Sequence, residues 1–179
     1  MTMMDKINGA TRMATQMIFD KESISYLEAG ALYGIVSQGR FNLSVLEALY
    51  NQAKDPELRT LVEQCIEQQV RTTVDNCEEA LRKGSAQVPQ FHFTRRQLHA
   101  HPLELPSDAC LTDGEIAATL GTMAKGSQMA ILAALHQSYQ LEVGMMLRKR
   151  LDEGLDWNLR LLNLMLNRGW LPHITKVEH

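Results

Sequence analysis

Two stretches of this chain end in the same way: "LRKGSAQVP" at residues 81–89 and "LNRGWLP" at residues 166–172. In each, a leucine lies two positions before a basic residue, a glycine comes next, and a proline follows. Cations favour the negative end of a helix dipole, glycine takes the left-handed cap, and proline prevents a restart. Both stretches therefore predict helix ends. Their glycines, Gly84 and Gly169, lie 85 positions apart, which suggests a duplicated unit.

An apolar stripe with helical spacing precedes each of these endings, and the second stripe is the first shifted by 85. At an apolar content of 45%, seven successive matches arise by chance roughly 0.4% of the time. The stripes therefore favour duplication. The first consists of Leu58, Val62, Ile66, Val70, Val74, Cys77 and Leu81, and the second of Val143, Leu147, Leu151, Leu155, Leu159, Leu162 and Leu166.

The starts of the two units also match, with a shift of 87. Ser25-x-x-Glu28 and Thr112-x-x-Glu115 are both expected to form capping boxes, in which hydroxyl and carboxylate satisfy backbone N–H groups reciprocally. The two extra residues of the first unit are placed in "KDPE" at 54–57, where Asp55-Pro56 predicts a helix stop and a new start.

Each unit is thus predicted to be a helical hairpin. The turn in "HQSYQLEV" contains no glycine or proline and is inferred only from the repeat, so that a single bent helix is the alternative there. Strand signals such as sustained alternation are missing, and the chain is predicted to be all-α. The expected helices span about 25–52, 56–83, 113–138 and 141–168.

The hairpins, at 25–83 and 112–169, are joined by residues 84–111, which contain three prolines and little periodicity. This connection is long enough to run the length of a bundle. A simple up-down bundle needs only a short link. We therefore expect residues 1–179 to form one ferritin-like four-helix bundle domain, with 1–22 as an N-terminal extension that packs on a neighbour or is disordered.

Composition excludes several classes of function. The net charge is −3, and no basic block with interleaved aromatics is present, so we expect neither nucleic-acid nor membrane binding. The N-terminus has no long apolar core, and no run is long enough to span a membrane, so we expect a cytoplasmic protein. Cys65, Cys77 and Cys110 lack C-x-x-C spacing and are interpreted as reduced thiols.

Residues 111–172 carry a resemblance to a known family. An acidic helix start (Asp113 and Glu115) is followed by a mid-helix Lys125, the pair Glu142-Val143 opens the next helix, and Asn167–Leu171 closes it. This pattern resembles the Coat F type of spore coat proteins of endospore-forming bacteria, and related uncharacterised bundles of the same type.

The "VPQF" stretch at 88–91 is similar to the crossover of these uncharacterised relatives. The Pro-x-Leu-Arg opening usual for the fourth helix occurs here in the second, at 56–59, which favours the broader group of bundles. The resemblance implies a ferritin-like fold and an intracellular origin, and it implies no established reaction.

A dimetal site in such a bundle needs a Glu on each of two helices and Glu-x-x-His on each of the other two. Glu28 and Glu115 are at matched positions, but capping explains both. Glu63 and Glu67 are followed three residues later by Ile66 and Val70 rather than by histidine. His136 is expected to favour its helix end. These five side chains are the weak metal candidates, and we expect no metal and no cofactor.

Other potential sites are weaker still. His92, His99 and His101 cluster in the crossover, where surface histidines are commoner than metal ligands. Cys65 and Cys77 are expected in the core, and no histidine is placed to activate Cys110. Four glycines, Gly34, Gly39, Gly121 and Gly126, allow either a small-ligand pocket between helices or, as we prefer, close helix packing.

The last helix has little polar face between Leu159 and Leu166, which predicts deep burial or a subunit interface. We therefore expect a non-enzymatic, self-associating structural protein of the spore coat type. It would form homodimers, contact other coat proteins and be deposited on the spore coat. The alternative is a ferritin-like metal-binding protein or oxidoreductase with an atypical carboxylate site.

Overall fold

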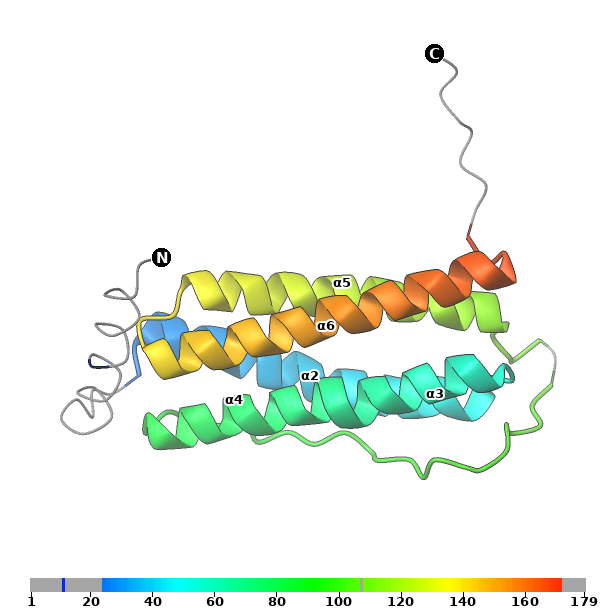
Figure 1. The fold of residues 1–179 in the computed structure, drawn as a ribbon. Helices are drawn as coiled ribbons and strands as arrows, with labels where there is room; N and C mark the ends of the chain where they lie inside the picture. The colour runs from blue at the N-terminus through cyan, green and yellow to red at the C-terminus, as the bar shows by residue number, and fades with distance from the viewer. Residues whose placement is uncertain (1–10, 12–23, 107, 172–179) are drawn as a thin grey trace, which may run out of the picture.

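The computed structural model describes residues 11, 24–106 and 108–171. Within these residues it contains two helical hairpins and no strand, and the hairpins pack side by side as a four-helix bundle (Figure 1). This confirms the predicted all-α, ferritin-like connectivity. The elements are α2 (Tyr26–Gln52), α3 (Pro56–Gln64), η1 (Cys65–Arg71), α4 (Thr72–Lys83), α5 (Asp113–His136) and α6 (Leu141–Arg168).

The second predicted helix, 56–83, is one continuous helical rod with an unpredicted π-helical segment, η1, at its centre. The turn between α5 and α6 lies at 137–140, so the repeat located it correctly and the single bent helix is wrong. Helix α5 ends at His136, two residues before the expected 138. Gln137 is its C-cap.

The two matching helix ends use their glycines differently. Gly169 adopts the predicted left-handed conformation, with φ 67°. Gly84 does not: its φ is −79°, and Ser85 takes the left-handed position with φ 57°. A side chain at 84 would lie 2.6 Å from the Ile24 side chain, so glycine is required there for close packing.

The helix starts are capped largely as predicted. Asp55 accepts the N–H groups of Glu57 and Leu58, with proline at the first helical position. Thr112 and Glu115 form the full capping box. The capping box predicted at Ser25 and Glu28 is only half formed. Ser25 Oγ accepts the Glu28 N–H, but the Glu28 carboxylate turns into the bundle.

Each hairpin supplies a carboxylate to the turn of the other hairpin. Glu28 of α2 is only 1% exposed. Its carboxylate accepts the N–H groups of Tyr139 and Gln140 at 3.0 and 2.9 Å. Asp113 on α5 accepts those of Lys54 and Asp55 at 2.8 and 3.1 Å. The donors and the acceptors are both related by the 85-residue shift, although Glu28 is the third residue of its helix and Asp113 the first. These reciprocal caps fix how the hairpins dock.

Ion pairs repeat the same symmetry at the helix ends. Arg168 at the end of α6 lies 3.2 Å from Glu57, and Lys83 at the end of α4 lies 3.8 Å from Glu142. Arg168 also pairs with Asp55 at 2.8 Å. Partial burial on its own would raise the pKa of Asp55, but the hydrogen bond from Arg168 and those from backbone N–H groups lower it overall.

The apolar core is divided into two clusters, one toward each end of the bundle. One gathers residues from the end of α2 with α3, the start of α5 and the end of α6, around Trp157. The other gathers the start of α2 with α4, the end of α5 and the start of α6, around Leu147. Cys65 belongs to the first and Cys77 to the second, as expected for core thiols.

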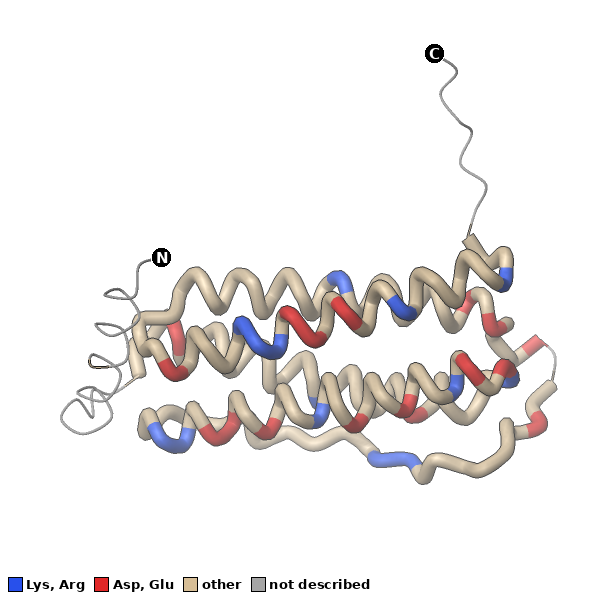
Figure 2. The backbone as a smooth tube through the Cα atoms, viewed as in Figure 1, with Lys and Arg blue, Asp and Glu red and all other residues tan. Residues whose placement is uncertain are grey.

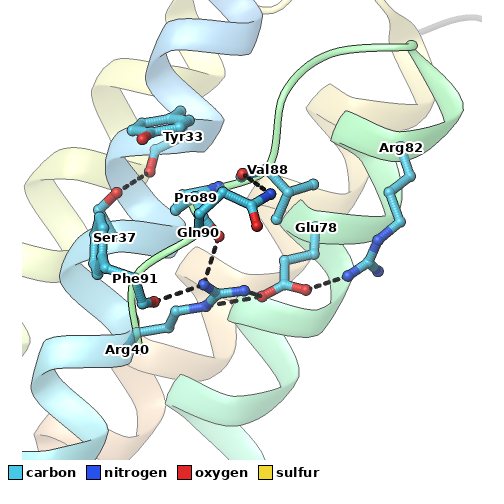
Figure 3. A network of polar contacts seen from close by, with 9 residues as sticks. All are labelled: Tyr33, Ser37, Arg40, Glu78, Arg82, Val88, Pro89, Gln90 and Phe91. Carbon is cyan, nitrogen blue, oxygen red and sulfur yellow. Dashed lines mark hydrogen bonds and ion pairs between the residues drawn. The ribbon is translucent and has the colours of Figure 1, made fainter. Parts of the chain in front are cut away.

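The crossover, residues 84–106 and 108–112, runs along the bundle (Figure 1). Polar side chains of α2 bind it over much of its length. Arg40 donates to the carbonyls of Pro89 and Phe91 and pairs with Glu78 of α4 at 2.6 Å (Figure 3). Ser44, Glu47 and Asn51 of α2 bind the crossover at Thr94, Arg95, Arg96, Gln97, His99 and Leu103.

A buried arginine, Arg59, also links the crossover to the C-terminal end of α2. Arg59 donates to the Tyr50 and Ala53 carbonyls at the end of α2, and to the carbonyls of His99 and Ala100 in the crossover. Its guanidinium also lies 4.2 Å from the centre of the Tyr50 ring. The arginine of the displaced Pro-x-Leu-Arg motif thus has a structural role.

Replacing Glu28 by alanine should lower the free energy of unfolding by about 2–3 kcal/mol, because two backbone donors lose a charged acceptor. The matched control is Glu115→Ala, at the repeat-equivalent position. Its carboxylate is exposed, so its loss should lower the free energy of unfolding much less. Urea unfolding followed by circular dichroism measures both. Equal losses would contradict the inter-hairpin role of Glu28.

The thiols should differ sharply in reactivity. Burial raises the pKa of Cys65 and of Cys77 to about 12, so both are protonated in the folded protein near neutral pH. Cys110 is partly exposed. We expect iodoacetamide at pH 8 to label Cys110 alone in the native state and all three thiols in denaturant, as counted by mass spectrometry. Fast native labelling of Cys65 or Cys77 would contradict their burial.

Candidate functional site

The predicted carboxylate candidates do not come together. Glu28 and Glu115 lie at the starts of α2 and α5, which begin at opposite ends of the bundle (Figure 1). Both act as caps, and the hydrogen bonds of Glu115 with Thr112, first the backbone N–H and then the hydroxyl, lower the pKa of Glu115. Glu63 and Glu67 are exposed, and Glu67 pairs with Arg71.

The histidines in the described part of the chain also lie apart from these carboxylates, on the surface. His136 is exposed in the last turn of α5, where the prediction placed it. His92, His99 and His101 are exposed along the crossover, and His99 contributes its backbone N–H and carbonyl to the contacts with Asn51 and Arg59. Among the described residues, no cluster of three or more His, Cys, Asp or Glu side chains could hold a metal ion.

The sequence reasoning missed a polar layer that separates the two apolar clusters. On α2 it contains Gln38 and Asn42, and on α5 Ser127 and Gln128. Gln38 donates to Asn42 Oδ1 at 2.8 Å, Asn42 donates to Ser127 Oγ at 3.3 Å, and Gln128 donates to the Gly154 carbonyl at 2.9 Å. The signal was present in the sequence as uncharged polar residues within otherwise apolar helix faces.

The π-helical segment η1 lies in this layer, and side chains bind three of its successive carbonyls. The hydroxyls of Thr72 and Thr73 donate to the carbonyls of Glu67 and Gln69. Arg150 of α6 approaches the carbonyl between them, on Gln68, at 3.5 Å. π-Helical segments are rare and are frequent at functional sites.

A cavity of about 80 Å³ lies in the layer, lined by residues of α2, η1, α4, α5 and α6. Most of its wall is apolar, from residues such as Ile35, Val70, Leu120 and Trp157. Of the four glycines singled out in the sequence, Gly39 lines the cavity and packs so tightly that an added Cβ would clash with Val74. The expected close packing is wrong for Gly34, Gly121 and Gly126, because an added Cβ there would meet no atom within 4 Å.

The chemistry of this lining does not fit a metal centre of the ferritin-like kind. Such a centre needs several inward-facing carboxylates with histidines. The described lining offers no carboxylate and no imidazole, and its ionisable groups are the Cys65 thiol and the Arg150 guanidinium. A buried guanidinium repels a metal cation.

A second feature is an exposed apolar seam on α6, formed by Leu155, Leu159, Leu162 and Leu166. These side chains are 49%, 57%, 41% and 58% exposed. Their 4-3-4 spacing places them on one face of the helix, as in a coiled coil. No charged residue lies between Arg160 and Arg168, and the charges of α6 gather mainly in its first half (Figure 2).

The seam corrects one expectation drawn from the repeat. Leu155, Leu159, Leu162 and Leu166 were aligned with Val70, Val74, Cys77 and Leu81 of the first unit, of which the last three are buried. In α6 the core positions at this end are instead Trp157, Leu161, Leu164 and Met165. Since both stripes are apolar, the last part of α6 has an inner and an outer apolar face.

No helix in the described part of the chain is long and apolar enough to cross a membrane. No protein-family model matches the sequence, and no curated protein matches it.

Solved structures resemble the fold. A protein of Bacillus halodurans C-125 described as "a putative spore coat protein" is 22% identical, with a TM-score of 0.80 over 88% of this chain and 98% of that one. A conserved hypothetical protein from Mycobacterium tuberculosis, rv2844, is 14% identical, with a TM-score of 0.63 over 78% of this chain and 98% of that one. The expected resemblance to bundles of the spore coat type thus holds at the level of the fold.

Proposed function

We propose that this protein is a non-enzymatic structural protein of the spore coat type, which works by associating with copies of itself. Deposition on the spore coat and contact with other coat proteins belong to the same proposal. The observation that carries it is the leucine seam of α6, because four half-exposed leucines on one helix face are a typical interaction surface.

The geometry of the seam favours a second copy as its occupant. Leucines at 155, 159, 162 and 166 follow the pattern of a coiled-coil seam, which packs best against an equivalent seam. A two-fold axis across α6 would bring the two seams together in an isologous interface, the commonest kind among homo-oligomers. Helix α6 has 28 residues and is about 42 Å long, so a paired interface has ample length.

Charges on the same helix would help to set the register of this pairing. Going backward from Leu155 with the same spacing, the seam positions are Asp152 and Arg148, which form an i,i+4 ion pair, and then Met145 and Leu141. Met145 and Leu141 are also exposed apolar side chains. The charged pair Arg148–Asp152 interrupts the apolar seam. If one helix slid along its partner, these charges would be buried against leucines, so the pair disfavours such shifted arrangements.

Two further observations support a structural role over an enzymatic one. The middle of the bundle lacks the donor set of a ferritin-like dimetal centre, and none of Glu28, Glu63, Glu67, Glu115 or His136 lines the central cavity. The similar protein from Bacillus halodurans carries a spore coat description. The metal-binding alternative draws no support from the placement of its candidate residues.

Substituting Leu159 and Leu162 together by glutamate should weaken self-association at least about 100-fold. The interface loses apolar burial, and each copy brings two negative charges that lose water and repel those of the other copy. Sedimentation equilibrium over a concentration series measures this. The control is Leu27→Glu, which changes an exposed leucine of α2 outside the seam and should leave association unchanged.

Unfolding by urea should show that both variants remain folded, because none of the three leucines is buried. A wild-type protein that stays monomeric at the highest concentration tested would contradict the proposal. The coat part is tested in an endospore-forming host: a tagged wild-type chain should appear in the coat extract of purified spores, and the seam variant should be depleted from it. Absence of both from the coat would refute that location.

A further inference from the structure

The central cavity and the arginine beside it point to a ligand, independently of the seam. The cavity exists because residues with small side chains meet in the polar layer, among them Gly39, Ala124, Ala130 and Gly154. Its volume of about 80 Å³ compares with the roughly 10–15 Å³ that one water molecule needs. The space therefore suits a molecule of several non-hydrogen atoms.

The wall of the cavity has the composition of a small-molecule site. Such sites are largely apolar, with a few polar groups that orient the ligand. Here the apolar part comes from residues such as Ile35, Met123 and Ile131, and the polar part from Gln69, Ser127 and Arg150. A ligand with a hydrocarbon body and one polar end would match both parts.

Arg150 is the group that decides the polarity of that end. It is only 6% exposed, and it lines the cavity. Its Nη2 pairs with Glu153 at 2.6 Å, and its Nη1 makes a long contact with the Gln68 carbonyl at 3.5 Å. Its Nε is the one buried side-chain nitrogen or oxygen without a hydrogen-bond partner in the described part of the chain.

An unpaired N–H of a buried guanidinium costs free energy, and arginine prefers carboxylate oxygens as acceptors. Glu153 is partly exposed and engages a different nitrogen, so it does not satisfy Nε. An anionic oxygen of a ligand that reached from the cavity to Nε would satisfy this donor, while Glu153 keeps its pairing with Nη2. An ammonium group there would be repelled.

We propose that this cavity binds a short-chain monocarboxylate, with its hydrocarbon chain against the apolar wall and its carboxylate held by Arg150. The amide of Gln69 and the hydroxyl of Ser127 are further groups of the lining that could bind the carboxylate. The cavity volume sets the size: a chain of about four to six carbon atoms fills several water-sized positions without needing to open the helices.

The probe is hexanoate, titrated into the full-length protein labelled with ¹⁵N. Trp157 lines the cavity, and its indole N–H donates to the Leu61 carbonyl. The other tryptophan, Trp170, packs near Gly114 outside the cavity. Hexanoate should shift the Trp157 indole signal in a saturable manner and leave the Trp170 signal in place. Hexylamine, which has the same chain with a cationic end, should produce no saturable shift.

Two variants test the site itself. Ala124→Leu fills the cavity and should abolish the Trp157 shift, whereas Ala118→Leu makes the same change at an exposed position of the same helix and should preserve it. Arg150→Met keeps a long apolar side chain, removes the cation and should weaken hexanoate binding at least about tenfold. The same variant should bind hexanol as well as the wild type does, which reports that the cavity is intact.

Three results would overturn the proposal. One is the absence of a saturable shift with hexanoate in the wild type. Another is equal binding of hexylamine and hexanoate, since the guanidinium would then not select the ligand. The third is undiminished binding in Ala124→Leu, which would place the ligand elsewhere. None of these measurements depends on self-association, so this proposal and the coat proposal stand or fall separately.

Discussion

The exchange of carboxylates between the hairpins is the constraint on which the rest of the bundle depends. The carboxylates of Glu28 and Asp113 each accept two backbone N–H groups from the turn of the opposite hairpin. A shift of one hairpin along the other by a helical turn would strand a buried carboxylate and four donors. Such groups are costly when they are unpaired, so the caps fix the register in which the two apolar clusters form.

With that register fixed, the polar layer necessarily falls in the middle of the bundle. The uncharged groups there satisfy one another, as in the series Gln38, Asn42 and Ser127. Arg150 is the exception, because one of its donors is buried without a partner beside a cavity. A buried guanidinium that keeps one unpaired donor costs free energy. This unpaired Nε of Arg150 is the observation that most strongly supports the proposed ligand.

The two apolar faces of α6 connect this interior to the surface. Trp157, Leu161 and Leu164 pack inward, and the leucine seam faces outward on the same turns. Helix α6 thus contributes to the cavity wall through Arg150, Gly154 and Trp157 and to the proposed interface through its opposite side. The two proposed sites are separate surfaces of one element.

The sequence by itself determined the helices and their order. The endings at Gly84 and Gly169, the stripe repeated at 85 residues and the Asp55-Pro56 break set helix bounds that agree with the structure within about two residues, because caps and periodicity are local properties. Even the turn at 137–140, which has no signal of its own, followed from the repeat. The long crossover likewise sufficed to predict ferritin-like connectivity.

Only the tertiary structure decided how these residues are used. The local spacing of Ser25 and Glu28 predicts a capping box, but the Glu28 carboxylate binds a turn more than one hundred residues away. Gly84 and Gly169 have similar sequence surroundings, yet only Gly169 is left-handed, while Gly84 makes room for the Ile24 side chain. The cavity, η1 and the unpaired Nε of Arg150 depend on where four helices meet. Contacts between distant segments decide such features, and neither spacing nor composition within one segment encodes them.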